Sequence, residues 1–171
     1  MSYKEKLKNI STFIFDVDGV LTNGEVLVDG DRLLRSLNSK DGYAFQYASK
    51  MGYSIFAITG GNAADVKEKL IHLGFKYVFL KSSNKLQVYT DLKETFQIQD
   101  DEVLYMGDDI PDIQVMKAVH VSTCPQDAVS EVKSIASYQS PYLGGTGCAR
   151  DVIEQTLKVQ GKWLNDGAYT W

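Results

Sequence analysis

Short apolar runs alternate with segments of helical spacing along this chain. Each apolar run ends abruptly at a polar or glycine-containing segment, which is typical of a buried parallel strand. The runs are Thr12–Phe15, Ser54–Ile58, Tyr77–Leu80, Val103–Met106 and His120–Ser122. The helical segments are Asp41–Met51, Ala63–Leu73, Lys85–Thr95, Ile110–Ala118, Ala128–Ile135 and Val152–Val159. This order predicts an α/β, Rossmann-like fold in which a parallel sheet is flanked by helices.

One segment departs from this alternation. Residues 24–35 alternate apolar and polar side chains around Asp29-Gly30, which predicts a β-hairpin. The gaps between the predicted strands hold only this hairpin or a single helix, so no separate lid domain fits in them. We therefore expect one domain over residues 1–163, with a hairpin flap and no cap domain, followed by a mobile C-terminal tail at residues 164–171.

Composition and charge narrow the class of partner. The 171 residues are 44% hydrophobic and 23% charged, as in average globular domains. The net charge of -4 comes without a basic stripe, which argues against nucleic acid. No apolar stretch is long enough for a membrane span, and residues 1–9 are charged rather than leader-like. We expect a cytoplasmic protein without nucleic-acid or membrane partners, with Cys124 and Cys148 reduced.

Four polar features follow the predicted strands. Asp16-Val17-Asp18 follows the first strand, Thr59-Gly60 the second, Lys85 the third and Gly107-Asp108-Asp109 the fourth. In an open parallel sheet the ligand site lies beyond the carboxyl ends of the strands. Each feature alone is more often a turn, a helix start or a solvated charge. The functional hypothesis therefore depends on all four occurring in this order.

The carboxylates among these features suit phosphoryl transfer. Asp16 can accept a phosphoryl group, which divides one difficult hydrolysis into two steps. Asp18 can protonate the leaving oxygen and then deprotonate the attacking water. Carboxylates repel a phosphate dianion, so a cation is required. Mg²⁺ prefers carboxylate and water oxygens, and Asp16 and Asp108 can supply them.

The remaining groups would neutralise charge on the transferring oxygens. These are the Thr59 hydroxyl, the backbone N–H groups of Gly60 and Gly61, and the ammonium of Lys85. A phospho-receiver domain also combines acids, a threonine and a lysine. Its lysine follows the acids on a later strand, whereas Lys85 precedes Asp108, so the order does not fit a receiver.

These motifs resemble those of a known superfamily. Residues 16–22 (DVDGVLT) resemble the first motif of the haloacid dehalogenase superfamily of phosphotransferases, and Thr59, Lys85 and residues 107–109 resemble its other three. A closer resemblance is to the 3-deoxy-D-manno-octulosonate 8-phosphate (Kdo 8-phosphate) phosphatases, which act in the supply of Kdo for lipopolysaccharide. It lies in residues 38–43, 83–85, 107–112 and 144–151 and runs overall from about residue 7 to 163.

The resemblance implies an assembly, a metal site and a substrate site. Members are capless homotetramers in which a neighbouring subunit helps to close each active site around a sugar phosphate. The implied Mg²⁺ ligands are Asp16, Asp18 and Asp108, with Asp109 and Asp112 beside them. The implied phosphate- and substrate-binding residues are Thr59, Gly60, Gly61, Lys85, Asn38, Lys40, Asp41 and Gly42.

Two positions depart from the family's pattern. Gly61 and Thr146 stand where arginines are often found, and a guanidinium would suit a sugar carboxylate. Lys40, Lys69 and Arg150 are candidates to replace those charges. Three alternatives stay open: a nine-carbon keto sugar acid 9-phosphate as substrate, another sugar phosphate, or a non-catalytic assembly module related to sugar nucleotidyltransferases. Retention of the catalytic set argues against the module, because assembly alone needs none of it.

Overall fold

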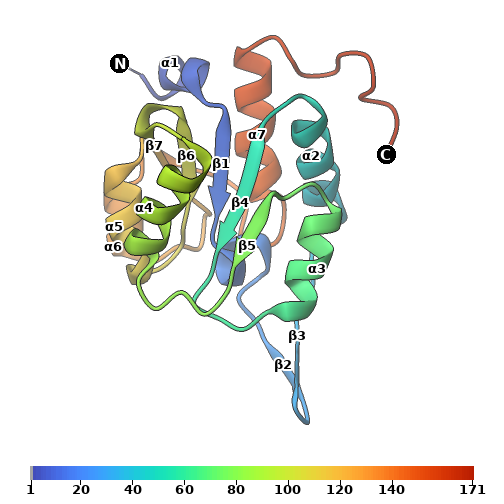
Figure 1. Ribbon diagram of the computed structural model, residues 1–171, viewed down its shortest axis with the longest axis vertical. Coiled ribbons are helices and arrows are strands. Elements are labelled where there is room, and N and C mark those ends of the chain that lie inside the picture. The colour runs from blue at the N-terminus through green and yellow to red at the C-terminus, as the bar shows by residue number, and fades with distance from the viewer. Residues whose placement is uncertain (1) are drawn as a thin grey trace.

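The computed structural model describes residues 2–171 and contains a six-stranded parallel sheet (Figure 1). In spatial order its strands are β5 (Tyr77–Phe79), β4 (Ser54–Ile58), β1 (Thr12–Phe15), β6 (Val103–Met106), β7 (Val121–Cys124) and β8 (Tyr138–Gln139). The helices are α1 (Tyr3–Lys6), α2 (Ser39–Lys50), α3 (Ala64–His72), α4 (Lys85–Phe96), α5 (Ile113–Ala118), α6 (Ser130–Ile135) and α7 (Cys148–Val159). The predicted Rossmann-like α/β fold is confirmed.

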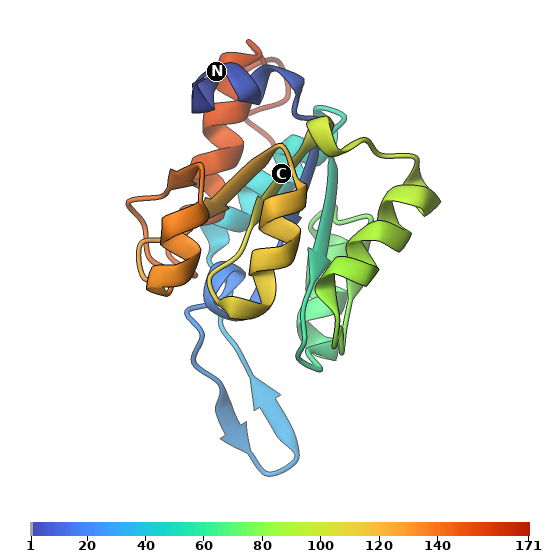
Figure 2. The same ribbon diagram turned by 90° about the vertical axis from the view of Figure 1, so that its left-hand side faces the viewer.

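Two apolar cores lie on opposite faces of the sheet. Successive side chains of a strand point to opposite faces, so Phe13 and Phe15 enter one core and Ile14 enters the other. Helices α2, α3 and α7 cover the first face, and α4, α5 and α6 cover the second (Figures 1 and 2). Burial of each side chain of this size contributes about 1.5–3 kcal/mol to the free energy of folding. This burial holds the strand ends in place.

The observed bounds differ from the predicted ones mainly at helix starts. Helix α7 begins at Cys148 instead of Val152, because Gly147 turns the chain with a φ of 119°. A carboxylate oxygen of Asp41 accepts the Arg150 N–H at 2.8 Å within the first turn. The segment predicted as one helix from Ile110 opens with a short 3₁₀ turn before α5. Strand β8 has only two residues, too few for the periodicity of the sequence to predict it.

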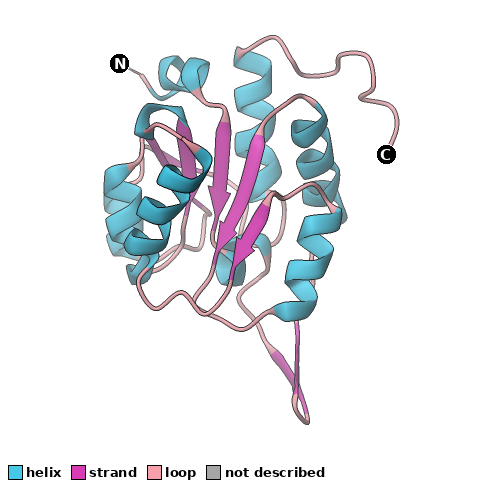
Figure 3. Ribbon diagram, viewed as in Figure 1, coloured by secondary structure: helices cyan, strands magenta, loops and turns pink. Residues whose placement is uncertain are grey.

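The predicted hairpin is present and stands away from the body of the protein (Figures 2 and 3). Strands β2 (Leu27–Asp29) and β3 (Arg32–Leu34) pair with each other and form a sheet of their own. Its apolar side chains are 38–67% exposed, and they are Val26, Leu27, Val28, Leu33 and Leu34. A row of exposed apolar residues of this kind is costly in water.

The segment predicted as a mobile tail lies against α2. The Tyr43 hydroxyl donates to the Ala168 carbonyl, and Ala168 is 4% exposed. The Asn165 N–H donates to the Tyr47 hydroxyl at 2.9 Å. The Trp171 ring meets Tyr43 edge-on, with 5.8 Å between the ring centroids.

The sequence predicts no membrane-spanning segment and two reduced cysteines, and the structure bears on both. None of the described helices combines the length and apolarity that a bilayer span requires. Cys124 and Cys148 are both buried and are free thiols.

Candidate active site

The loop after β1 carries the predicted nucleophile. Asp16 follows the last residue of β1 and is 7% exposed, and its Oδ1 accepts the Val17 N–H at 2.7 Å. The loop then passes Gly19, which has a φ of 89°. A Cβ at Gly19 would lie 2.0 Å from an Asp108 carboxylate oxygen. Only glycine therefore allows this loop to approach the end of β6.

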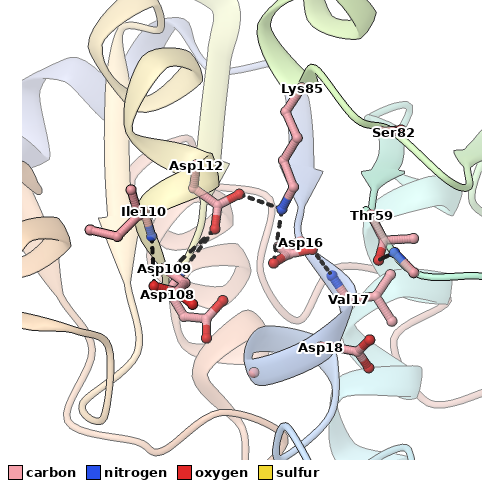
Figure 4. A network of polar contacts seen from close by, with 12 residues as sticks. Asp16, Val17, Asp18, Thr59, Ser82, Lys85, Asp108, Asp109, Ile110 and Asp112 are labelled. Atoms are coloured by element: carbon pink, nitrogen blue, oxygen red, sulfur yellow. Dashed lines mark hydrogen bonds and ion pairs between the residues drawn. The ribbon is translucent and has the colours of Figure 1, made fainter.

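A buried lysine joins the ends of β1 and β6. The Lys85 Nζ lies 3.0 Å from Asp16 Oδ2 and 2.7 Å from Asp112 Oδ1 (Figure 4). Asp112 is fully buried and also accepts from the Tyr105 hydroxyl at 2.5 Å and from the Asp108 N–H at 3.1 Å. The carboxylate that was predicted beside the metal ligands therefore stands within the charged centre, where it orients Lys85.

Three carboxylates crowd together at this edge of the sheet. Oxygens of Asp16, Asp108 and Asp112 lie within 4.8 Å of one another. Burial, and then the neighbouring Asp112, raise the pKa of Asp16 well above its usual value and that of Asp108 to about 7. Burial would lower the pKa of Lys85, but Asp16 and Asp112 outweigh it and raise that pKa. A single ammonium does not balance these acids.

The cluster fits a divalent cation. Asp108 Oδ1 is buried and has no hydrogen-bond partner within residues 2–171. An orphaned carboxylate oxygen is costly to bury, and an oxygen-seeking cation would satisfy it. Asp109, in contrast, is exposed, and its Oδ1 accepts the Ile110 N–H at 2.7 Å, so its carboxylate starts a helical turn.

The Asp18 carboxylate lies apart from this cluster (Figure 4). Its oxygens accept from Arg35 Nε at 2.6 Å and Nη2 at 3.1 Å. The structure thus directs the Asp18 side chain, which is predicted as a metal ligand, toward Arg35 and not into the group of Asp16, Asp108 and Asp112 oxygens. The sequence does not predict a role for Arg35, because it follows directly after β3, at the end of the hairpin that joins the body of the protein (the foot of the hairpin), and belongs to no local motif.

The loop after β4 reaches the same edge of the sheet. Thr59 is 1% exposed, and its Oγ1 accepts the Gly61 N–H at 3.2 Å. A Cβ at Gly61 would lie 3.2 Å from Asp18 Oδ2. The structure thus brings the predicted Thr59-Gly60-Gly61 group beside Asp18.

Three predicted substrate residues instead have partners within the fold. Asn38 caps α2, with its Oδ1 accepting the Lys40 N–H at 2.8 Å. Asp41 is 1% exposed and faces α7. Gly42 packs on Leu73, where an added Cβ would meet a side-chain carbon at 3.5 Å. The structure does not bring these three residues into the Asp16 cluster.

The three basic side chains that are candidates to replace the missing arginines lie in two different cavities. Lys40 and Arg150 line a cavity of about 370 Å³ with Thr146, and none of the strand-end acids lines it. The Arg150 guanidinium lies over Tyr43, with 5.5 Å to the ring centroid. Lys69 lines a different cavity, of about 390 Å³, together with Arg35. Of the three candidates, Lys69 is therefore the one that shares a cavity with a partner of Asp18.

The glycine-rich stretch near the C-terminus supports the first loop. The Gly145 N–H donates to the Val20 carbonyl at 2.8 Å, and the Gly144 N–H donates to Asp127 Oδ1 at 2.9 Å. A Cβ at Gly144 would lie 2.0 Å from the Gly19 carbonyl oxygen. Side chains at this position would displace the loop that carries Asp16 and Asp18.

Comparison with protein families places this arrangement among known hydrolases. A family model described as haloacid dehalogenase-like hydrolase matches residues 70–149. The 3-deoxy-D-manno-octulosonate 8-phosphate phosphatase KdsC of Escherichia coli strain K12 is 35% identical over 158 residues, covering 92% of this chain and 84% of the relative.

Solved structures agree with the sequence comparison. The 3-deoxy-D-manno-octulosonate 8-phosphate phosphatase of Yersinia pestis matches with a TM-score of 0.91 at 31% identity, covering 94% of this chain and 87% of the other. The enzyme of the same name from Moraxella catarrhalis, in complex with a magnesium ion, a phosphate ion and KDO, matches with a TM-score of 0.91 at 25% identity. This second match covers 94% of this chain and 93% of the Moraxella catarrhalis chain.

Proposed function

Because the chain belongs to the 3-deoxy-D-manno-octulosonate 8-phosphate phosphatase family of haloacid dehalogenase-like hydrolases, we propose that it hydrolyses this sugar-acid phosphate to Kdo and phosphate. The observation that carries the proposal is the buried centre of Asp16, Lys85, Asp108 and Asp112, with Asp18 two residues beyond the nucleophile. Relatives named for that activity match nearly the whole length of the chain.

The geometry suits a two-step displacement. A carboxylate oxygen of Asp16 attacks phosphorus, and the bond from phosphorus to the sugar oxygen breaks. Asp18 gives its proton to that leaving oxygen. In the second step Asp18 takes a proton from the water that cleaves the aspartyl phosphate, which restores Asp16. Lys85, the Thr59 hydroxyl and the N–H groups of residues 60–61 stabilise the charge on the transferring oxygens.

The cofactor proposed for this site is Mg²⁺, which the Asp16 and Asp108 carboxylates would hold, with Asp18 as the third predicted ligand. When bound, the cation supplies positive charge between the carboxylates and the phosphate. Asp112 accepts from Lys85 and from the Asp108 N–H, so it keeps both groups in place. The crowding of acids and the orphaned Asp108 oxygen support this assignment.

Replacing the nucleophile tests the mechanism. Asp16→Asn keeps the side-chain volume and removes the attacking charge. We expect turnover below about a thousandth of the wild-type value, on the scale of losing a nucleophile. Phosphate release is measured with Mg²⁺ against a panel that contains the eight-carbon and nine-carbon keto acid phosphates and common sugar phosphates. Retained turnover would refute the phospho-aspartate, and circular dichroism verifies the fold.

The panel also decides the substrate. The nine-carbon keto sugar acid 9-phosphate stays a second candidate substrate. Gly61 and Thr146 occupy the two positions where the family often has an arginine. A kcat/KM at least tenfold higher on the nine-carbon compound would reassign the substrate and leave the chemistry unchanged. No release from any compound would favour the assembly module.

We further propose a cytoplasmic homotetramer in which the hairpins of neighbouring chains meet. The support is the exposed apolar row of the hairpin, with Leu27 at 66% and Val28 at 67% exposure. Association buries such residues at about 25 cal/mol per Å² and covers the open strand edges. Sedimentation velocity should show a tetramer that dissociates in Val28→Asp, with Ile71→Asp on α3 as the control. A fully active wild-type monomer would refute the assembly, and cell fractionation tests the location.

A further inference from the structure

Arg35 and Asp18 form a two-point ion pair at the foot of the hairpin. Nε lies 2.6 Å from Oδ1, and Nη2 lies 3.1 Å from Oδ2. The Arg35 side chain is 4% exposed, whereas that of Asp18 is 31% exposed. The other arginine of the hairpin, Arg32, pairs with Asp29 but is 69% exposed. Surface pairs of that kind contribute little, while a buried guanidinium fork fixes geometry.

Three segments of the chain build this contact. The third guanidinium nitrogen, Nη1, donates to the Leu33 carbonyl at 3.3 Å, so the fork is tied to the hairpin backbone. On the other side stands Gly61, where an added Cβ would lie 3.2 Å from Asp18 Oδ2 and 3.5 Å from Arg35 Nη2. The absence of a side chain at Gly61 therefore leaves the room that the pair occupies.

Asp18 has little else to hold its carboxylate. The Thr22 hydroxyl reaches Oδ1 only at 3.5 Å, which is the limit for a hydrogen bond. An acid that must reach a leaving oxygen and later a water needs a defined orientation, because proton transfer depends on geometry before strength. Arginine itself cannot supply that proton, since it remains charged in proteins.

We infer that Arg35 is a positioning residue that holds the Asp18 carboxylate for proton transfer and thereby couples the placement of the hairpin to catalysis. The inference rests on the acid–base role proposed for Asp18. It makes a specific claim about mechanism: Arg35 acts through Asp18 and not through a contact of its own with the substrate. The hairpin thus contributes to the chemistry through its foot as well as to the assembly through its apolar strands.

A double-mutant cycle tests this claim. Arg35→Ala should lower kcat about tenfold to a hundredfold, within the range of general acid–base catalysis, with KM changed less than about threefold. In the Asp18→Asn background the same substitution should change kcat less than about twofold, because the group it serves is gone. Arg32→Ala, on the same hairpin, is the matched control. Additive losses, or a loss confined to KM, would overturn the inference.

Leaving-group dependence gives a second readout. The ratio kcat/KM reports the phosphorylation step, and p-nitrophenolate departs without a proton. Arg35→Ala should therefore lower kcat/KM at least tenfold more on the sugar-acid phosphate than on p-nitrophenyl phosphate, and equal losses would contradict the inference. If the alanine variant melts below the assay temperature, Arg35→Lys replaces it in both tests. Wild-type activity of Asp18→Asn would contradict the proposed acid–base mechanism itself, which is a separate outcome.

Discussion

The Asp41→Asn variant should gain stability relative to the wild type as the pH rises. Asp41 is 1% exposed, and one of its oxygens, Oδ2, is buried without a hydrogen-bond partner within residues 2–171. Burial raises its pKa from 3.8 to about 6, against the lowering effect of the Arg150 N–H. An acid with a raised pKa binds its proton more tightly in the folded state. The wild type therefore loses stability as the pH rises above the unfolded pKa, and the loss is complete above the folded pKa.

The size of this effect follows from the shift. A rise of about two units corresponds to about 3 kcal/mol in total, at about 1.4 kcal/mol per unit. Linkage places roughly half of that between pH 5 and pH 7.5. We therefore expect the free energy of unfolding of Asp41→Asn, minus that of the wild type, to increase by about 1.4 kcal/mol over this interval.

Urea unfolding at the two pH values measures this difference, because each midpoint gives a free energy when the slope is unchanged. Asp65→Asn, an exposed acid in the first turn of α3, controls for the loss of one negative charge. A difference that stays constant with pH, or that decreases, would refute the reasoning. Such a result would mean that Asp41 ionises as readily in the folded protein as in the unfolded chain.

Further predictions concern the supporting loop, the metal and the lysine. Gly144→Ala should reduce kcat/KM at least tenfold, because its Cβ would lie 2.0 Å from the Gly19 carbonyl, whereas Gly42→Ala, with an ordinary 3.5 Å contact, should change it little. Chelation should abolish phosphate release and Mg²⁺ should restore it, whereas Ca²⁺ should inhibit because its oxygen shell is larger and looser; activity that survives chelation would exclude the metal. Lys85→Met should lower the free energy of unfolding by about 3–5 kcal/mol without metal, because it leaves Asp16 and Asp112 unpaired, and an unchanged melting temperature would contradict that view.

Much of the site was predictable because its residues follow strands. Asp16, Thr59 and the Asp108 loop each come directly after a buried apolar run, and parallel strands bring their carboxyl ends to one edge. Lys85 begins the helix after β5, so it reaches the same edge. Periodicity therefore indicated both the sheet and the place of these side chains in it.

Other assignments remain predictions, because a residue type does not reveal its partner. Asp41 and Asn38 lie in a segment that resembles a substrate motif, yet in the structure they bond to the starts of α7 and α2. Asp112 is predicted beside the metal ligands, and only the structure reveals its bonds to Lys85 and Tyr105. Polar groups of this kind serve equally well as caps, ligands or catalysts.

By itself the sequence determined the alternation of strands and helices, the absence of room for a lid, and the order of the four motifs. These properties follow from local periodicity and from spacing along the chain. Only the tertiary structure decided that Arg35 meets Asp18 across 17 residues and that Asp41 meets Arg150 across 109. The physical reason is that such pairs form where separate elements pack together, and that packing depends on the shapes of all the buried side chains between them.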